Sequence, residues 1–189
     1  DPANAGRQMP SHWGHRRLNI PSQSSCTGTP WLHAVGCADA GPIYERVEQI
    51  PDRESAHQPD EVTYVSVGDG ATSEGEFWEA LSTACVRKLP VLFLVEDNGY
   101  AISVPVEVQT PGGDIARVVE GFVGLTIFRC DGTDYLSSYR TMAEAVTHAR
   151  AGDGPVLVHA SVVRPYSHSL SDDERLYKTP AERESEARR

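Results

Sequence analysis

Two short runs carry the backbone and side-chain groups that could bind a divalent cation and a phosphate. The first, GDGATSEG at residues 68–75, places Asp69 between two glycines. Glycines let the backbone approach a ligand closely, and Mg²⁺ beside a phosphate takes one or two carboxylates as ligands. The second, EDNGYAIS at residues 96–103, offers the amide oxygen of Asn98 and the backbone carbonyl of Tyr100. Each run alone is also explained as an ordinary tight turn, so the prediction depends on whether the two meet.

The alternation of elements along the chain predicts that they do meet. Apolar, β-branched runs predict strands at 62–67, 91–95, 125–129 and 156–163. Helices are predicted at 29–40 with Thr29 as the cap, at 73–88 opened by a Ser73–Glu76 capping box, at 115–122, and at 134–149 capped by Asp134. This order is typical of an α/β fold, a parallel sheet with helices on both faces. Ligands bind beyond the carboxyl ends of such strands, where both runs stand.

Composition predicts one globular domain over residues 1–189. The chain is 39% apolar and 23% charged, which fits a folded protein with a core. We interpret this domain as truncated at both ends, because the sequence opens without methionine and a helical pattern at 180–189 stops short. Residues 41–61 turn polar, which predicts a helical extension and then a surface loop.

Charge and cysteine spacing exclude several classes of function. The formal net charge of −10 disfavours binding to nucleic acid and to an anionic membrane. No apolar run reaches the roughly 20 residues that a membrane-spanning helix needs. The four cysteines are scattered without a C-x-x-C pair, so we expect neither a zinc site nor a disulfide framework, and we predict a cytoplasmic protein.

Taken together, the two runs resemble a known cofactor signature. A GDG turn, 26 further residues and then Asp97-Asn98 is similar to the thiamine diphosphate signature. The longer runs GDGATSEGEFWEAL and NGYAIS are more specific, because they point to one family among the enzymes with this signature. They resemble the α subunit of the decarboxylating component of pyruvate and branched-chain 2-oxo acid dehydrogenase complexes. GRQMPSHWG at 6–14 and RPYSHSLSDD at 164–173 also resemble this family, over nearly all of residues 6–180. The fold implied is the thiamine diphosphate-binding fold, a Rossmann-like three-layer sandwich, here incomplete.

The resemblance implies a role for each matching residue. Mg²⁺ would be bound by Asp69, Asn98 and the backbone carbonyl of Tyr100. The remaining cofactor contacts implied at the two turns are the backbone of Gly68, Gly70 and Ala71, with Asn98 beside them. Two positions depart from the family pattern: Asp97 stands where an asparagine is usual, and Glu96 stands where a basic residue would contact the diphosphate. A phosphate contact is therefore not expected from Glu96.

Two loops outside the signature complete the implied site. Ser25, in the run SSCTGT, would contact the thiamine diphosphate. Residues 164–178 would form an active-site loop in which His168 contacts the cofactor and passes a proton during catalysis. Asp172, Asp173 and Tyr177 are interpreted mainly as residues that order this loop.

The function implied is oxidative decarboxylation of a 2-oxo acid, with transfer of the acyl group to a lipoyl group on a partner acyltransferase. The glutamate that activates the thiamine ring comes in this family from a β-type subunit or a fused β domain, which is not present among these residues. Two alternatives stay open. One is an acetoin-cleaving or other thiamine diphosphate enzyme, and the other is a non-catalytic remnant subunit that acts in assembly.

Overall fold

Four apolar runs form one fully parallel sheet, as the sequence pattern predicts. The computed structural model describes residues 5–51 and 57–188. Its main sheet has the order β1-β2-β6-β5, with β1 (Thr63–Gly68), β2 (Val91–Asp97), β5 (Thr126–Asp131) and β6 (Val156–Ser161). In the register of the sheet, Gly68 pairs with Glu96 and Asp97 pairs with Ser161. The two candidate runs therefore leave neighbouring strands at the same edge.

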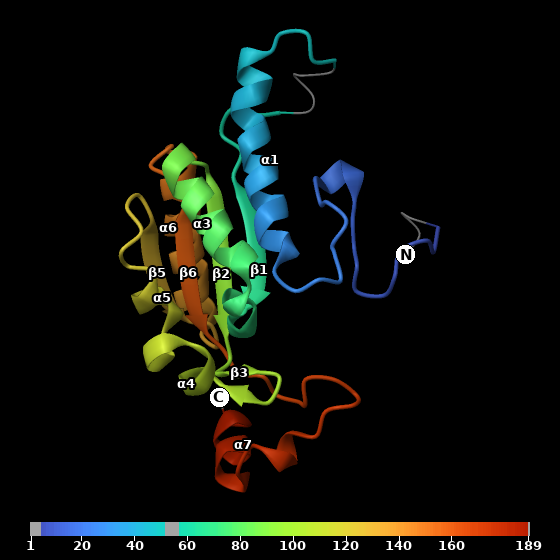
Figure 1. The fold of residues 1–189 in the computed structure, drawn as a ribbon, viewed down its shortest axis with the longest axis vertical. Helices are drawn as coiled ribbons and strands as arrows, with labels where there is room; N and C mark the ends of the chain where they lie inside the picture. The colour runs from blue at the N-terminus through green and yellow to red at the C-terminus, as the bar shows by residue number, and fades with distance from the viewer. Residues whose placement is uncertain (1–4, 52–56, 189) are drawn as a thin grey trace.

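Helices cover both faces of this sheet and make a three-layer sandwich (Figure 1). On one face α1 (Thr29–Arg46), α3 (Gly75–Arg87) and the single turn α5 (Ile115–Val118) enclose the larger core. The aromatic ring of Trp31 lies 5.3 Å from that of Phe77 and 5.7 Å from that of Phe93. On the opposite face α6 (Tyr135–Arg150) buries Ala145 against Val158 and other strand residues. The predicted fold class is thus confirmed.

Several predicted element ends are wrong. The Ser73–Glu76 capping box does not form, since α3 begins only at Gly75 and residues 69–73 make a separate short 3-10 helix, η3 (Asp69–Ser73). Thr29 is already helical, and the residue before the helix is Gly28. The predicted helix at 115–122 is one turn long, and β6 ends at Ser161 rather than 163. The Asp134 cap is confirmed, because its carboxylate accepts hydrogen bonds from two backbone N–H groups of α6.

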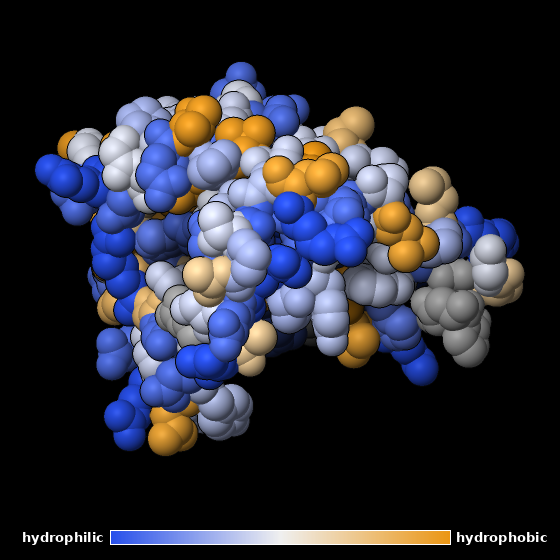
Figure 2. Space-filling view, turned by 90° about the horizontal axis from the view of Figure 1, so that it is seen from below, coloured by the Kyte–Doolittle hydropathy of each residue, from blue (hydrophilic) through white to orange (hydrophobic). Residues whose placement is uncertain are grey.

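Further short elements gather beyond the carboxyl ends of the strands, below the sheet in Figure 1. After β2 the chain forms a small hairpin, β3 (Tyr100–Ala101) and β4 (Val104–Pro105), and then α4 (Val106–Gln109) and the short η4 (Pro111–Gly113). After β6 it forms η5 (Glu174–Leu176) and α7 (Pro180–Glu186). Figure 2 views the molecule from this end, where hydrophilic residues dominate and hydrophobic ones are scattered.

The amino-terminal part is mostly irregular, with the short 3-10 helix η2 (Arg16–Leu18) before α1. Within the polar extension predicted at 41–61, α1 continues to Arg46, so its first part is helical as expected. The part of that extension at 52–56 lies outside the described residues. In the described part of the chain, no helix combines the length and the apolar character that crossing a membrane requires.

Candidate metal and diphosphate site

The turns after β1 and β2 contact each other directly. The backbone N–H of Asn98 donates to Oδ1 of Asp69 at 3.3 Å. Asp69 is only 1% exposed, although it carries a carboxyl group. Parallel pairing of β1 and β2 produces this contact, because it brings the carboxyl ends of both strands to one edge. The predicted meeting of the two runs is confirmed.

Gly70 makes this close approach possible. A Cβ atom at Gly70 would stand 2.8 Å from the Cβ of Ala101 and 3.2 Å from its Cα. Real side chains do not approach that closely, so the first turn fits against the hairpin only with glycine here. The space beside its α-carbon is filled by Ala101 of the β3–β4 hairpin.

Two buried oxygens at this contact have no hydrogen-bond donor among the described residues. They are Oδ2 of Asp69 and Oδ1 of Asn98. A buried polar atom without a partner is costly, and native structures usually satisfy it with protein, water or an ion. One carboxylate oxygen and one amide oxygen that both lack a donor fit a hard cation, because such ions bind oxygen ligands.

The charge balance of the site also suits a cation. Burial raises the pKa of Asp69 above its ordinary value, and the nearby negative charge of Asp97 raises this pKa further. An added positive ion would reverse both effects, since it stabilises the ionised carboxylate. The described residues contain no group of three or more His, Cys, Asp or Glu side chains that could hold a metal. The oxygen pair here differs in kind, since it has one carboxylate oxygen and one amide oxygen.

The turn conformation argues against the ordinary explanation of Asn98. Within residues 96–103, Gly99 and Ile102 adopt the left-handed backbone, with φ of +79° and +57°, whereas Asn98 does not. Asparagine is therefore not required here for its tolerance of left-handed geometry. The side-chain amide, rather than the backbone preference, is what distinguishes this position.

Gln109 of α4 holds the first turn from the other side. Its Nε2 donates to the backbone carbonyl of Asp69 at 2.9 Å and to Oγ of Ser73 at 2.9 Å. Thr72 donates its hydroxyl to the same Asp69 carbonyl at 2.7 Å. The Ser73 hydroxyl is thereby engaged with α4 instead of capping α3. Sequence reasoning missed Gln109 because α4 is too short to give a periodic pattern.

Both residues that depart from the family pattern have partners of their own. Asp97 accepts a hydrogen bond from the backbone N–H of Gly99 at 2.9 Å, and its other oxygen lies 2.7 Å from Nε2 of His159. Asp97 therefore orders the second turn. Glu96 accepts a hydrogen bond from the hydroxyl of Ser66 on β1.

The loop that carries Ser25 reaches the first turn through Gly28. Gly28 has φ of +93°, and a Cβ atom there would lie 2.8 Å from the Cβ of Glu74, directly after η3. The Ser25 side chain is exposed and bonds to Nε2 of His12 at 2.6 Å. Since Nδ1 of His12 lies 2.8 Å from the carbonyl of Pro10, Nδ1 donates there and Nε2 accepts from Ser25. The structure thus links the run at 6–14 to Ser25.

The loop at 164–178 is fastened to the second turn by Arg164. Its guanidinium donates to the carbonyl of Ile102 at 2.9 Å and to the Tyr177 hydroxyl at 2.6 Å. It also lies 5.9 Å from the ring centres of both Tyr100 and Tyr177. Tyr177 in turn donates to Asp172 at 2.6 Å. The interpretation of Asp172 and Tyr177 as loop-ordering residues agrees with these contacts.

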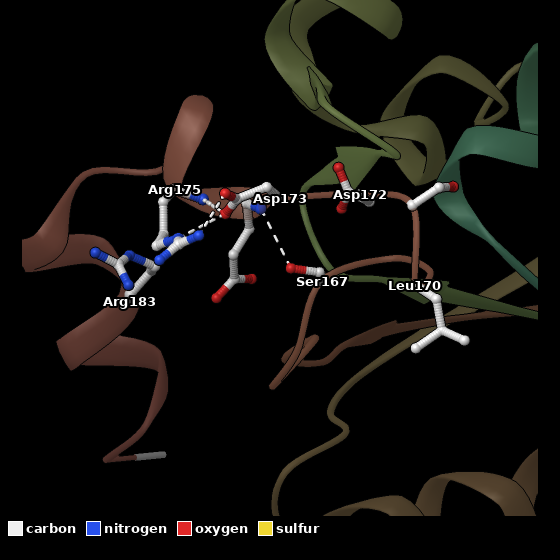
Figure 3. A pocket seen from close by; sticks show the side chains of 8 residues that line it. Ser167, Leu170, Asp172, Asp173, Arg175 and Arg183 are labelled. Carbon is white, nitrogen blue, oxygen red and sulfur yellow. Dashed lines mark hydrogen bonds and ion pairs between the residues drawn. The ribbon is translucent and has the colours of Figure 1, made fainter.

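His168 stands in this loop with an exposed side chain. Its backbone N–H donates to Asp172 at 2.8 Å, which fixes the chain at this residue. Beside it the loop and α7 line an open depression of about 490 Å³ (Figure 3). Asp173 and Arg175 form an ion pair at 2.7 Å on its wall, next to Arg183 of α7. The residues that line the depression are mostly polar and come from the loop and α7, and they do not include the turns after β1 and β2.

Comparison with known proteins supplies the identification. The family model described as "Dehydrogenase E1 component" matches residues 3–189. The chain belongs to this family. Members of the E1 family generally use thiamine diphosphate and Mg²⁺. The resemblance drawn from the sequence motifs is confirmed, and it is of the α-subunit type.

Individual E1 relatives agree with this assignment. The chain is 36% identical over 180 residues to the 2-oxoisovalerate dehydrogenase subunit alpha of Bacillus subtilis, which covers 94% of this chain and 50% of the relative. It is 43% identical over 155 residues to the 3-methyl-2-oxobutanoate dehydrogenase subunit alpha of Mycobacterium tuberculosis, over 82% of this chain and 38% of the relative. The chain thus spans half or less of the length of these E1 α subunits.

A pyruvate-type E1 relative and a solved structure also match. The pyruvate dehydrogenase E1 component subunit alpha of Mycoplasma genitalium is 37% identical over 123 residues, which is 65% of this chain and 34% of the relative. A crystal structure from Mycobacterium smegmatis, described as that of a thiamin diphosphate-dependent enzyme, superimposes with a TM-score of 0.51 and 26% identity. It covers 77% of this chain and 24% of the other.

Proposed function

We propose that this chain supplies the α-type half of a thiamine diphosphate and Mg²⁺ site in a 2-oxo acid dehydrogenase. The whole enzyme would decarboxylate a 2-oxo acid oxidatively and transfer the acyl group to a lipoyl group on a partner acyltransferase. The observation that carries the proposal is the pair of buried oxygens without donors, Asp69 Oδ2 and Asn98 Oδ1, on two turns joined by a hydrogen bond. Membership in the E1 family supports the choice of cofactor.

In this proposal the two turns bind and orient the cofactor. Asp69, Asn98 and the carbonyl of Tyr100 would hold Mg²⁺, which takes its remaining ligands from diphosphate oxygens and water. Gly68, Gly70 and Ala71 would present their backbone to the diphosphate. When bound, thiamine diphosphate supplies the electron sink that decarboxylation of a 2-oxo acid requires. The protein contributes position, a low-water environment and proton transfer.

Ser25 and His168 would act on the reacting side of the cofactor. The Ser25 hydroxyl already has its direction set by His12, so its oxygen lone pairs stay available to a ligand. His168 lies in a loop whose backbone is fixed by Asp172, which leaves its imidazole exposed for hydrogen bonding and proton transfer. Residues from a β-type subunit or fused β domain would complete the site.

Calorimetry tests this proposal. The native protein, purified with its associated subunits, is titrated with thiamine diphosphate in the presence and absence of Mg²⁺. We expect coupled binding, which Asp69→Ala and Asn98→Ala each abolish. Asp131→Ala is the matched control, because Asp131 also ends a strand of the same sheet, two strands away from β2. Unchanged binding in the Asp69 and Asn98 variants would refute the metal assignment.

The substrate class is tested separately. Two of the relatives, 36% and 43% identical to this chain, are named as dehydrogenases of 2-oxoisovalerate and of 3-methyl-2-oxobutanoate, so branched-chain 2-oxo acids come first in a panel that also contains pyruvate and acetoin. Decarboxylation is followed with an artificial electron acceptor. Turnover of a 2-oxo acid supports the proposal, whereas turnover of acetoin alone would favour acetoin cleavage. Cofactor binding without any turnover would favour a non-catalytic subunit.

A further inference from the structure

A buried histidine behind the second turn takes no part in the site described so far. His159 lies on β6 and is 7% exposed. Its Nε2 lies 2.7 Å from Oδ2 of Asp97, and its Nδ1 lies 3.1 Å from Nη1 of Arg129 on β5. Arg129 continues the series through a 2.9 Å ion pair with Asp114. Four side chains from three strands and the start of α5 thus form one connected series.

The hydrogen-bond directions along this series are fixed by chemistry. A guanidinium can only donate, so Arg129 donates to Nδ1 of His159. The imidazole proton must then be on Nε2, which donates to the Asp97 carboxylate. The other oxygen of Asp97 accepts from the backbone N–H of Gly99. Asp97 therefore receives one hydrogen bond from β6 and one from the turn that presents Asn98.

We propose that His159 is a positioning residue for the Asn98 metal ligand and acts through Asp97. This inference rests on the proposed function. His159 sets the rotamer of Asp97, and Asp97 sets the backbone from residue 97 to residue 99. This route holds Asn98, whose backbone N–H donates to Asp69, without a direct contact to His159. Groups behind metal ligands commonly act in this way, and their loss weakens metal binding by about 10–100-fold.

The series also explains how an aspartate is accommodated at position 97. An aspartate near the metal turn needs a donor, and His159 supplies one from the sheet interior. Asparagine at 97 has only one acceptor oxygen, so its N–H₂ would face either the Nε2–H of His159 or, after an amide flip, the N–H of Gly99, and a donor meets a donor in both cases. The imidazole cannot take its other tautomer, because Arg129 occupies Nδ1. Position 97 and position 159 are therefore coupled.

This coupling predicts that a paired substitution at positions 97 and 159 restores the hydrogen-bonded series. With Asp97→Asn and His159→Glu together, the new carboxylate accepts from Arg129 and from the new amide. The formal charge of the pair stays the same. The single change His159→Gln should also preserve the series, because its amide oxygen accepts from Arg129 and its amide nitrogen donates to Asp97. His159→Leu fills the same buried position with an apolar side chain and loses both hydrogen bonds.

The experiment measures Mn²⁺ affinity by electron paramagnetic resonance in the native protein with thiamine diphosphate present. We expect affinity to fall about 10–100-fold in His159→Leu and in Asp97→Asn, and to return in His159→Gln and in the double variant. His148→Leu is the control, since His148 bonds to Thr126 of β5 at 3.0 Å from the α6 face. Its Mn²⁺ affinity should equal that of the wild type.

A metal-free measurement separates this inference from the proposed function. Amide hydrogen exchange without metal should be faster at Gly99 in His159→Leu, because the acceptor on Asp97 is no longer fixed. If wild-type protein fails to bind Mn²⁺, the proposed function falls, and the exchange rates alone decide whether His159 positions the turn. Wild-type affinity and exchange in His159→Leu, or no recovery in the double variant, would overturn the inference.

Discussion

The backbone N–H of Asn98 donates to Oδ1 of Asp69, and this single contact joins the ends of two neighbouring parallel strands. It leaves the second oxygen of Asp69 and the amide oxygen of Asn98 buried and without donors. One carboxylate oxygen of Asp69 therefore holds the two turns together, and the other is available to a ligand. An ionised carboxylate oxygen is a ligand that Mg²⁺ commonly takes in proteins.

Gly70→Ala should separate the two turns. The added Cβ would stand 2.8 Å from the Cβ of Ala101, so we expect a loss of about 1–3 kcal/mol in the free energy of unfolding and weaker Mg²⁺ binding. Urea denaturation and calorimetry measure these. Ala101→Gly in the same protein should recover part of both losses. Gly36→Ala is the control, because nothing lies within 4 Å and alanine favours the helix. A Gly70→Ala protein as stable as the control would contradict the packing argument.

Gln109→Glu should loosen the first turn. Two hydrogen bonds from Nε2 would be lost, and a carboxylate would face the carbonyl of Asp69. We expect faster amide exchange in residues 69–73 and a lower Mg²⁺ affinity. Ser73→Ala removes only one of the two acceptors and serves as the milder comparison. Equal exchange in both variants would mean that the Asp69 carbonyl does not depend on α4.

Arg164→Lys should free the loop at residues 164–178. Lysine cannot donate to the Ile102 carbonyl and the Tyr177 hydroxyl at once with the geometry of a guanidinium. We expect faster limited proteolysis within residues 164–178. The control is Arg175→Lys, whose ion pair with Asp173 is exposed and contributes little. Equal cleavage rates in the two variants would show that Arg164 does not hold the loop.

The contact between Asp172 and Tyr177 should limit the pH range in which this loop is ordered. The Tyr177 hydroxyl lowers the pKa of Asp172 below its ordinary 3.8, helped by the backbone N–H of His168. Burial and then the bond to Asp172 raise the pKa of Tyr177 to about 12. A lowered carboxyl pKa stabilises the loop above pH 3.8, and this stabilisation is lost as the pH falls through the lowered value. A raised tyrosine pKa stabilises it below pH 10, and this is lost as the pH rises through about 12.

Carbon NMR of the Asp172 carboxyl checks the acid side. Tyr177→Phe should move the Asp172 pKa back toward 3.8, while the pKa of Asp173, held at about 2 mainly by its hydrogen bond from Arg175, stays where it is. If Tyr177→Phe left the Asp172 pKa unchanged, the hydroxyl would not be its main cause.

Periodicity and motif together predicted the sheet, its helices and the meeting of the two turns. They succeeded because strand runs such as 91–95 are long, apolar and buried, and because a spaced signature identifies both strand ends. The start of α3 was missed, since Ser73 bonds to Gln109, which is distant in sequence. His159 was hidden for the same reason: within an apolar run it has no local signal, and its role comes from Asp97 and Arg129 on neighbouring strands.

The roles of Ser25 and His168 stay predictions of the family resemblance. Both side chains are exposed, and among the described residues no contact between either of them and the turns after β1 and β2 supports the roles. The structure does supply reasons for their positions, since Gly28 brings the Ser25 loop to Glu74 and Arg164 ties the His168 loop to Ile102. Neither contact is visible from spacing alone.

Anomalous diffraction from crystals of the native protein grown with Mn²⁺ and thiamine diphosphate tests the central claim most directly. The account predicts one strong manganese peak about 2.0–2.3 Å from Asp69 Oδ2, Asn98 Oδ1 and the carbonyl oxygen of Tyr100, with diphosphate oxygens completing its coordination. Bound thiamine diphosphate whose metal lies away from Asp69 and Asn98, or crystals in which both oxygens bind only water, would contradict it.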